Sequence, residues 1–342
     1  MTIDSEPVTT AGAIALANLE VRIDGYVSRV DGGRPTVGGR VELIELIALR
    51  GQLLGSIGDL EQAVALADDL VAQVPSDARS FVARARMRAV FHRFAAALSD
   101  LDTAAALGGG SVVLDAERAG LYQALGRYDE ALEIRRPAAV ANPVFSTLAA
   151  LALLHGERGE LDLAESRFAA ASRHYRGTSP FPMAMLEFQR GKLWIENDDH
   201  GRARTWIGSA VRRLPAYVPA QGHLAELDAD RGDTGAAIAR LRPLALSSDD
   251  PDYATQLARV LSDAGHTDEA RTWRDKAEAR YDDLLADHYA AFADHAAEFW
   301  LTVGGDSERA LALARQNLSL RQTPRARALV RRASSWSVAE HW

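Results

Sequence analysis

Apolar and polar residues follow one another along this chain at the spacing of amphipathic helices, and the helices come in pairs. From Ala11 to Val30, apolar side chains recur every three or four residues, which predicts a first helix with one buried face. After residue 40 the pattern becomes a repeat of roughly thirty-five residues, in which a short turn leads five residues later to an alanine within a helix. The hydrophobic pattern therefore predicts an all-α chain built from helical hairpins.

The repeat is clearest in its turns. One of them reads Gly126-Arg127-Tyr128-Asp129-Glu130-Ala131, and five of the turns begin with glycine, whereas Val90 and Asp198 replace it in two weaker copies. The copies end at eight alanines: Ala63, Ala95, Ala131, Ala164, Ala203, Ala237, Ala270 and Ala310. Self-similarity at this period is typical of an α-solenoid, here of about eight antiparallel hairpins in which each repeat packs only on its neighbours.

Two further positions of the repeat identify a family. A small residue precedes the turn by seven positions, as Ala119 precedes Gly126, and a proline follows the anchoring alanine by twelve, as at Pro143. A proline there would stop the second helix. This combination resembles the tetratricopeptide repeat over about residues 40–322. The resemblance implies a right-handed superhelix with capping helices at its ends, and it leaves the ligand open because the fold binds many.

The pattern divides the chain into five segments. We expect a disordered stretch over residues 1–9, a capping helix and glycine-rich loop over 10–39, the repeat array over 40–322, a basic capping helix over 323–335 and a tail over 336–342. The helix from Thr267 to Ala286 is predicted to be longer than the others and to run almost directly into the next. The tail carries Trp336 and Trp342 without a packing period, so it either docks on the last hairpin or is presented to a partner.

Composition narrows the classes of function. The 342 residues are 47% apolar and include no cysteine, which excludes thiolate metal sites and disulfides. A net charge of -8 argues against general nucleic-acid binding, and no long apolar run predicts a membrane helix. The N-terminal residues show no secretory signal pattern. We therefore expect a soluble, cytoplasmic protein.

The resemblance also implies where a ligand would bind. In that family the first helix of each hairpin lines a concave groove, and two positions one turn apart face the ligand. Counted back from each turn, these positions form a polar ladder: Gln189 and Lys192, His223 and Glu226, Gln256 and Arg259, and His295. The alternative is an ordinary solvated surface, because exposed helix faces are polar without any ligand.

A second candidate site lies in a run of titratable residues. On one helix His295 and Glu298 would be neighbours, and His288 would lie two turns earlier, which suggests a metal or acid–base site. Two turns correspond to about 10 Å, a long separation for two ligands of one ion. Interhelical hydrogen bonds or a solvated face are the alternative.

These observations leave three hypotheses. The first, which the architecture favours, is a scaffold or adaptor that binds a protein or peptide in its groove, with no cofactor. The second is a metal-dependent enzyme or accessory protein that uses the histidine–carboxylate cluster. The third is a structural scaffold that associates with itself as a homo-oligomer. No recognised catalytic motif appears in the sequence to favour an enzyme.

Overall fold

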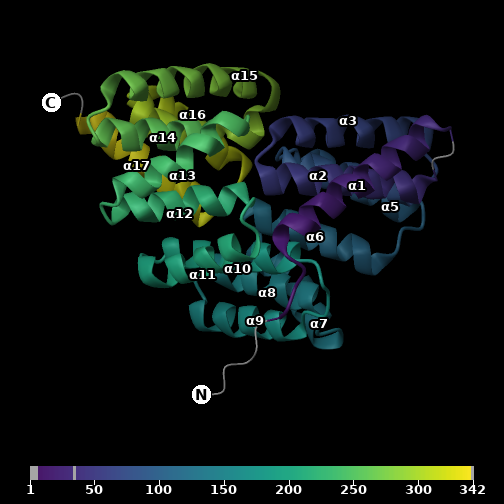
Figure 1. Ribbon diagram of the computed structural model, residues 1–342. Helices are drawn as coiled ribbons and strands as arrows, with labels where there is room; N and C mark the ends of the chain where they lie inside the picture. Colours follow the sequence, from purple (N-terminus) through teal and green to yellow (C-terminus); the bar gives the residue numbers. More distant parts are fainter. Residues whose placement is uncertain (1–6, 34–35, 340–342) are drawn as a thin grey trace.

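The computed structural model describes residues 7–33 and 36–339, and the described residues form helices without any strand (Figure 1). The helices before the middle of the chain are α1 Gly12–Asp31, α2 Val37–Leu54, α3 Ile57–Gln73, α4 Ala78–Val90, α5 Phe94–Ala106, α6 Ser111–Leu125, α7 Tyr128–Ala141, α8 Phe145–Glu157 and α9 Leu161–His174. Those that follow are α10 Phe181–Ile195, α11 His200–Arg213, α12 Val218–Asp230, α13 Thr234–Ser247, α14 Pro251–Asp263, α15 Thr267–Phe299, a short π-helix η1 Trp300–Gly304, α16 Ser307–Leu320 and α17 Pro324–Ala339.

The repeated alanines anchor the helix pairs. Ala131, Ala164 and Ala237 are completely buried, and each follows by five residues a glycine with positive φ that ends the preceding helix. Such a left-handed residue turns the chain so that the second helix packs back on the first. The prediction of Ala95 as an anchor is wrong: Ala95 is exposed and Ala97 is fully buried. The reason is that His92, at φ 53°, is the left-handed residue of that turn, two positions after Val90.

Small residues allow the paired helices to approach closely, as the pattern predicted. Ala225 and Ala258 are buried at 0% and 1% exposure. Gly191 of α10 packs directly on Ile207 of α11, and a Cβ atom added to the glycine would overlap the isoleucine side chain. These positions are therefore sensitive to added volume.

The ends of the array differ from the predicted boundaries. Helix α2 begins at Val37, inside the predicted loop, because the Thr36 hydroxyl accepts a hydrogen bond from the Gly39 amide at 3.1 Å and caps the helix. Helix α17 continues to Ala339, beyond the predicted end of the capping helix at residue 335. The Trp336 side chain and all of Trp342 lie outside the part that the structure describes.

The predicted long helix is confirmed. Helix α15 runs from Thr267 to Phe299 and is interrupted at His288, whose φ of -135° and ψ of 41° are not helical. The His288 ring packs against the Phe91 ring in a tilted arrangement, with 4.1 Å between centroids, and its Nε2 atom lies 2.9 Å from Glu61. The kink therefore turns the second half of α15 so that it forms a hairpin with α16.

Distant parts of the chain also pack together, so the prediction that each repeat contacts only its neighbours is wrong. Helices α1–α3 share a core with α10–α12, and the start of α3 lies against the loop between α13 and α14 (Figure 1). There the Asp249 carboxylate accepts hydrogen bonds from the amides of Ile57, at 2.6 Å, and Gly58, at 2.8 Å. The Gln322 amide likewise donates to the Leu125 carbonyl at 3.0 Å, which joins the end of α16 to α6.

Candidate functional site

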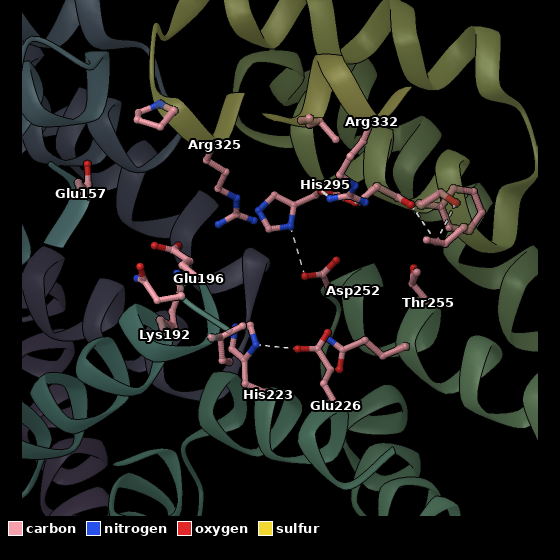
Figure 2. A pocket seen from close by; sticks show the side chains of 18 of the residues that line it. Glu157, Lys192, Glu196, His223, Glu226, Asp252, Thr255, His295, Arg325 and Arg332 are labelled. Carbon is pink, nitrogen blue, oxygen red and sulfur yellow. Dashed lines mark hydrogen bonds and ion pairs between the residues drawn. The ribbon is translucent and has the colours of Figure 1, made fainter. Parts of the chain in front are cut away.

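A cavity of about 670 Å³ lies where the ends of α8 and α10 face α12, α14, the second half of α15 and α17 (Figure 2). Three successive hairpins supply one wall through α10, α12 and α14, and α17 folds back to supply another. Apolar contributions come from Ile195, Phe299 and Leu329, but most lining side chains are polar or charged. Such a surface suits a ligand that carries hydrogen-bonding and charged groups.

The structure gathers six of the seven residues of the predicted ladder around this cavity. They are Lys192, His223, Glu226, Gln256, Arg259 and His295. The seventh, Gln189, lines a neighbouring cavity of about 210 Å³, which shares Lys192 with the first. The ladder residues meet because they occupy the same phase in successive first helices, one turn apart within each helix. Their role in binding a ligand stays a prediction.

Two of the lining histidines are held by carboxylates. His223 and Glu226 lie one turn apart on α12, with Nδ1 and Oε2 separated by 2.7 Å. His295 projects from α15 toward α14, where its Nδ1 atom lies 3.2 Å from Oδ2 of Asp252 (Figure 2). The other oxygen of Asp252 accepts a hydrogen bond from the Tyr281 hydroxyl at 2.8 Å. Each carboxylate therefore fixes the orientation of an imidazole that faces the cavity.

The charges around His295 keep it protonated. Burial lowers the pKa of the imidazole, but the negative charges of Asp252 and Asp294 outweigh burial and raise the pKa to about 9. Burial alone would raise the pKa of Asp252, whereas the charge and hydrogen bond of His295 lower it to about 2. The pair is thus an imidazolium and a carboxylate at neutral pH. His295 offers the cavity a positive charge rather than the lone pair of a general base.

Three further cations line the cavity without an acidic partner. Among the described residues, Lys192, Arg259 and Arg325 form no hydrogen bond or ion pair with another side chain. Lys192 instead lies over the Phe188 ring, 5.8 Å from its centroid. Burial lowers the pKa of Lys192, and the nearby positive charge of Arg325 lowers it further. Glu196 and Glu157, which both line the cavity, supply the nearby negative charges at this end.

Sequence reasoning missed several lining residues. Asp252 lies one turn before Gln256 on α14, so extending the ladder by one turn would have found it. Arg325 and Arg332 belong to α17. Arg332 forms a bidentate pair with Glu298, in which Nη1 lies 2.8 Å from Oε1 and Nη2 lies 2.5 Å from Oε2. Nothing in the repeat pattern indicates that α17 returns to the cavity, because a capping helix has no counterpart in the other repeats.

The predicted metal site is not formed by its three residues. His288 points toward Glu61 and Phe91, whereas His295 pairs with Asp252 and Glu298 pairs with Arg332. The kink at His288 is the physical reason, because it breaks the helical phase that would have placed this side chain on the face of His295. Within residues 7–33 and 36–339, no cluster of three metal-ligating side chains is present.

The helices of the described segments are also too short or too polar to cross a membrane.

No protein-family model matches the sequence, and no curated protein matches it either. Solved structures do match. One of them, the human IFIT1 dimer with PPP-AAAA, is 16% identical over 85% of this chain and 76% of its own, with a TM-score of 0.55.

Two other solved structures are more distant. The chain is 14% identical to the APC/C hetero-tetramer Cut9–Hcn1, with a TM-score of 0.48, over 87% of this chain and 55% of that chain. A tetratricopeptide repeat protein from Parabacteroides merdae is 14% identical over 92% of this chain and 98% of its own, with a TM-score of 0.39. The chain spans about half the length of the Cut9–Hcn1 chain that it matches. At these identities the similarity shows the fold alone.

Proposed function

Because the chain has the tetratricopeptide-repeat fold, we propose that it is an adaptor that binds a segment of a partner protein in the cavity between α10, α12, α14, α15 and α17. The observation that carries this proposal is the ladder itself. Successive hairpins present polar side chains at the same phase, and all but Gln189 line one continuous surface. A polypeptide segment offers matching donors, acceptors and charges at regular intervals, which suits a surface that repeats from helix to helix.

The cavity favours a peptide over a purely apolar ligand. Its fixed acid–base pairs are His295 with Asp252 and His223 with Glu226, and its free cations include Lys192 and Arg259. A buried oxygen of Gln256 also has no hydrogen-bond partner among the described residues. A ligand that donates a hydrogen bond to this oxygen would satisfy a group that is costly to bury alone. Backbone amides of a bound peptide are donors of the required kind.

The test is a selection from a random peptide library displayed on phage, followed by affinity measurement with synthetic peptides. We expect peptides that bind the wild-type chain and lose at least about tenfold in affinity to Lys192→Ala, because one charge-assisted hydrogen bond is worth about 1.5–3 kcal/mol. The matched control is Arg136→Ala on α7, where the side chain is exposed and outside the cavity. Circular dichroism melting would show that both variants fold.

The outcomes are distinct. Peptides whose affinity falls with Lys192→Ala and not with Arg136→Ala would support binding in the cavity. Equal binding to both variants would place the peptide elsewhere and contradict the proposal. A single-stranded oligoadenylate is included as a competitor, since the solved structure of the IFIT1 dimer contains PPP-AAAA. If this oligonucleotide binds more tightly than every selected peptide, the ligand of the cavity is a nucleic acid and the peptide proposal is contradicted.

A further inference from the structure

A second cleft, of about 490 Å³, adjoins the cavity between α14, the first turns of α15 and η1. The cavity and this cleft share Arg259 and Thr302, so a segment that fills the first can continue into the second. The other polar residues that line the cleft are Ser262, Asp263, Thr267, Arg271 and Arg274. Three arginines thus face one cleft whose lining contains a single carboxylate, that of Asp263.

Arg259 is the cationic residue that both spaces share, and no described side chain pairs with it. The side chain is half-buried on α14, and no described residue accepts a hydrogen bond from its guanidinium. A guanidinium has five N–H donors and cannot lose its charge in a protein. These donors are not paired with any described side chain, so an anion bound at this point could accept charge-assisted hydrogen bonds from several of them at once.

The other two arginines, Arg271 and Arg274, pair with exposed aspartates that would compete only weakly with a bound ligand. Arg271 lies 3.6 Å from Asp268, and the two side chains are 63% and 96% exposed. Arg274 lies 2.6 Å from Asp275, the next residue along the helix, with exposures of 41% and 57%. Exposed ion pairs of this kind contribute little to stability, because solvent screens them. Both guanidinium groups can consequently exchange their aspartates for a ligand that binds several donors at once.

The spacing on α15 places the donors on one face. Thr267, Arg271 and Arg274 are four and three residues apart, the separations at which helical side chains are neighbours. Thr267 and Ser262 add hydroxyl groups from the two helices that form the cleft. The lining therefore combines planar guanidinium groups with hydroxyl donors, the groups that proteins use to bind phosphate oxygens.

We propose that this cleft binds a phosphoryl group carried by a serine or threonine of the partner segment that occupies the cavity. A phosphorylated side chain has a charge of about -1.5 to -2 and three acceptor oxygens, which matches three arginines better than the single charge of a carboxylate does. The inference rests on the proposed function, because the phosphoryl group belongs to the bound segment. Phosphorylation of the partner would then strengthen its capture by the adaptor.

The test uses three fluorescein-labelled pools of degenerate nonapeptides, whose central residue is phosphoserine, serine or glutamate. Fluorescence anisotropy gives the affinity of each pool for the wild type and for Arg271→Gln/Arg274→Gln. The matched control is Arg136→Gln/Arg212→Gln, which removes two exposed arginines from α7 and α11. We expect the wild type to bind the phosphoserine pool about tenfold or more tightly than the serine pool, as charge-assisted contacts predict. This preference should disappear only in Arg271→Gln/Arg274→Gln.

The results separate this inference from the proposed function. Equal affinity for the phosphoserine and serine pools would overturn the phosphoryl site, and loss of both through Lys192→Ala would still support the peptide cavity. Equal affinity for the glutamate and phosphoserine pools would overturn the phosphoryl site and show that the cleft binds a carboxylate instead.

Competition provides a second readout. Inorganic phosphate should compete only with the phosphoserine pool. Better competition by oligoadenylate than by phosphate would overturn the inference in favour of a nucleic acid, and no binding of any pool would contradict both proposals.

Discussion

The interfaces between neighbouring repeats and the junction between the two ends of the array are built differently. Each repeat interface has a local apolar centre: an alanine such as Ala131 or Ala237 is fully buried beside the turn that places it. The junction joins residues far apart in the chain. It combines an apolar cluster of Ile57, Phe91, Leu284 and Ala291 with polar contacts, those of Asp249 with the amides of α3 and of Glu61 with His288. Apolar packing at a fixed period makes the hairpins, whereas contacts between residues distant in the sequence, apolar and polar together, determine how the array closes.

The largest expected effect lies in the repeat interfaces. Replacing Ala225, which is completely buried, with leucine should lower the free energy of unfolding by about 1–3 kcal/mol, since added methylenes force packed helices apart. Ala258→Leu should act in the same way. Ala95→Leu is the matched control, because Ala95 is exposed. Urea unfolding measures all three, and a loss of stability in Ala95→Leu equal to that in Ala225→Leu would contradict the assignment of Ala225 to a close approach between helices.

Breaking the junction should cost less. Asp249→Ala removes the side chain that accepts hydrogen bonds from the amides of Ile57 and Gly58, and loss of a helix N-cap costs about 0.5–2 kcal/mol. Hydrogen exchange should also increase at the start of α3 but not within α10. Asp69→Ala, an exposed change on the same helix, provides the control. Unchanged exchange at α3 would show that Asp249 does not hold the junction.

The same contrast explains how much of the structure the sequence predicts. The hairpins and the phase of the ladder follow from the period, so Lys192, His223 and Arg259 were placed on one surface correctly. The contributions of Asp249 and Arg325 could not be predicted, because each depends on where a distant segment returns. Val90 is misleading as the turn residue, since the left-handed turn is made by His92, and positive φ is uncommon for residues other than glycine.

The charged pair in the cavity gives a smaller, pH-dependent effect. The raised pKa of His295 means that its stabilisation is complete below about pH 6.5 and is lost as the pH rises through about 9. The lowered pKa of Asp252 means that its contribution is lost as the pH falls from about 3.8 to about 2. Asp252→Asn should lower the pKa of His295, measured by NMR titration. Exposed His266 is the reference, and an unchanged His295 titration would contradict the pairing.

The smallest effect is expected at the C-terminal end. Deleting residues 334–342 should change the free energy of unfolding by no more than about 0.5 kcal/mol, the usual range for surface changes. Deleting residues 324–342 should destabilise the chain much more, because it removes Leu329 and Ala333, which are 3% and 0% exposed in the core. Thermal melting compares the two truncations. Equal destabilisation would place the tail of the chain in the core rather than at a surface for a partner.

The most direct test of the central claim is photo-crosslinking of a selected peptide that carries benzoylphenylalanine at each position in turn. The proposed binding mode predicts crosslinks to the cavity-lining faces of α10, α12, α14 and α15, and to α17 near Arg325. Mass spectrometry identifies the modified residues, and an excess of unlabelled peptide should abolish them. Crosslinks confined to the second helices of the hairpins, α11 and α13, would contradict binding in the cavity.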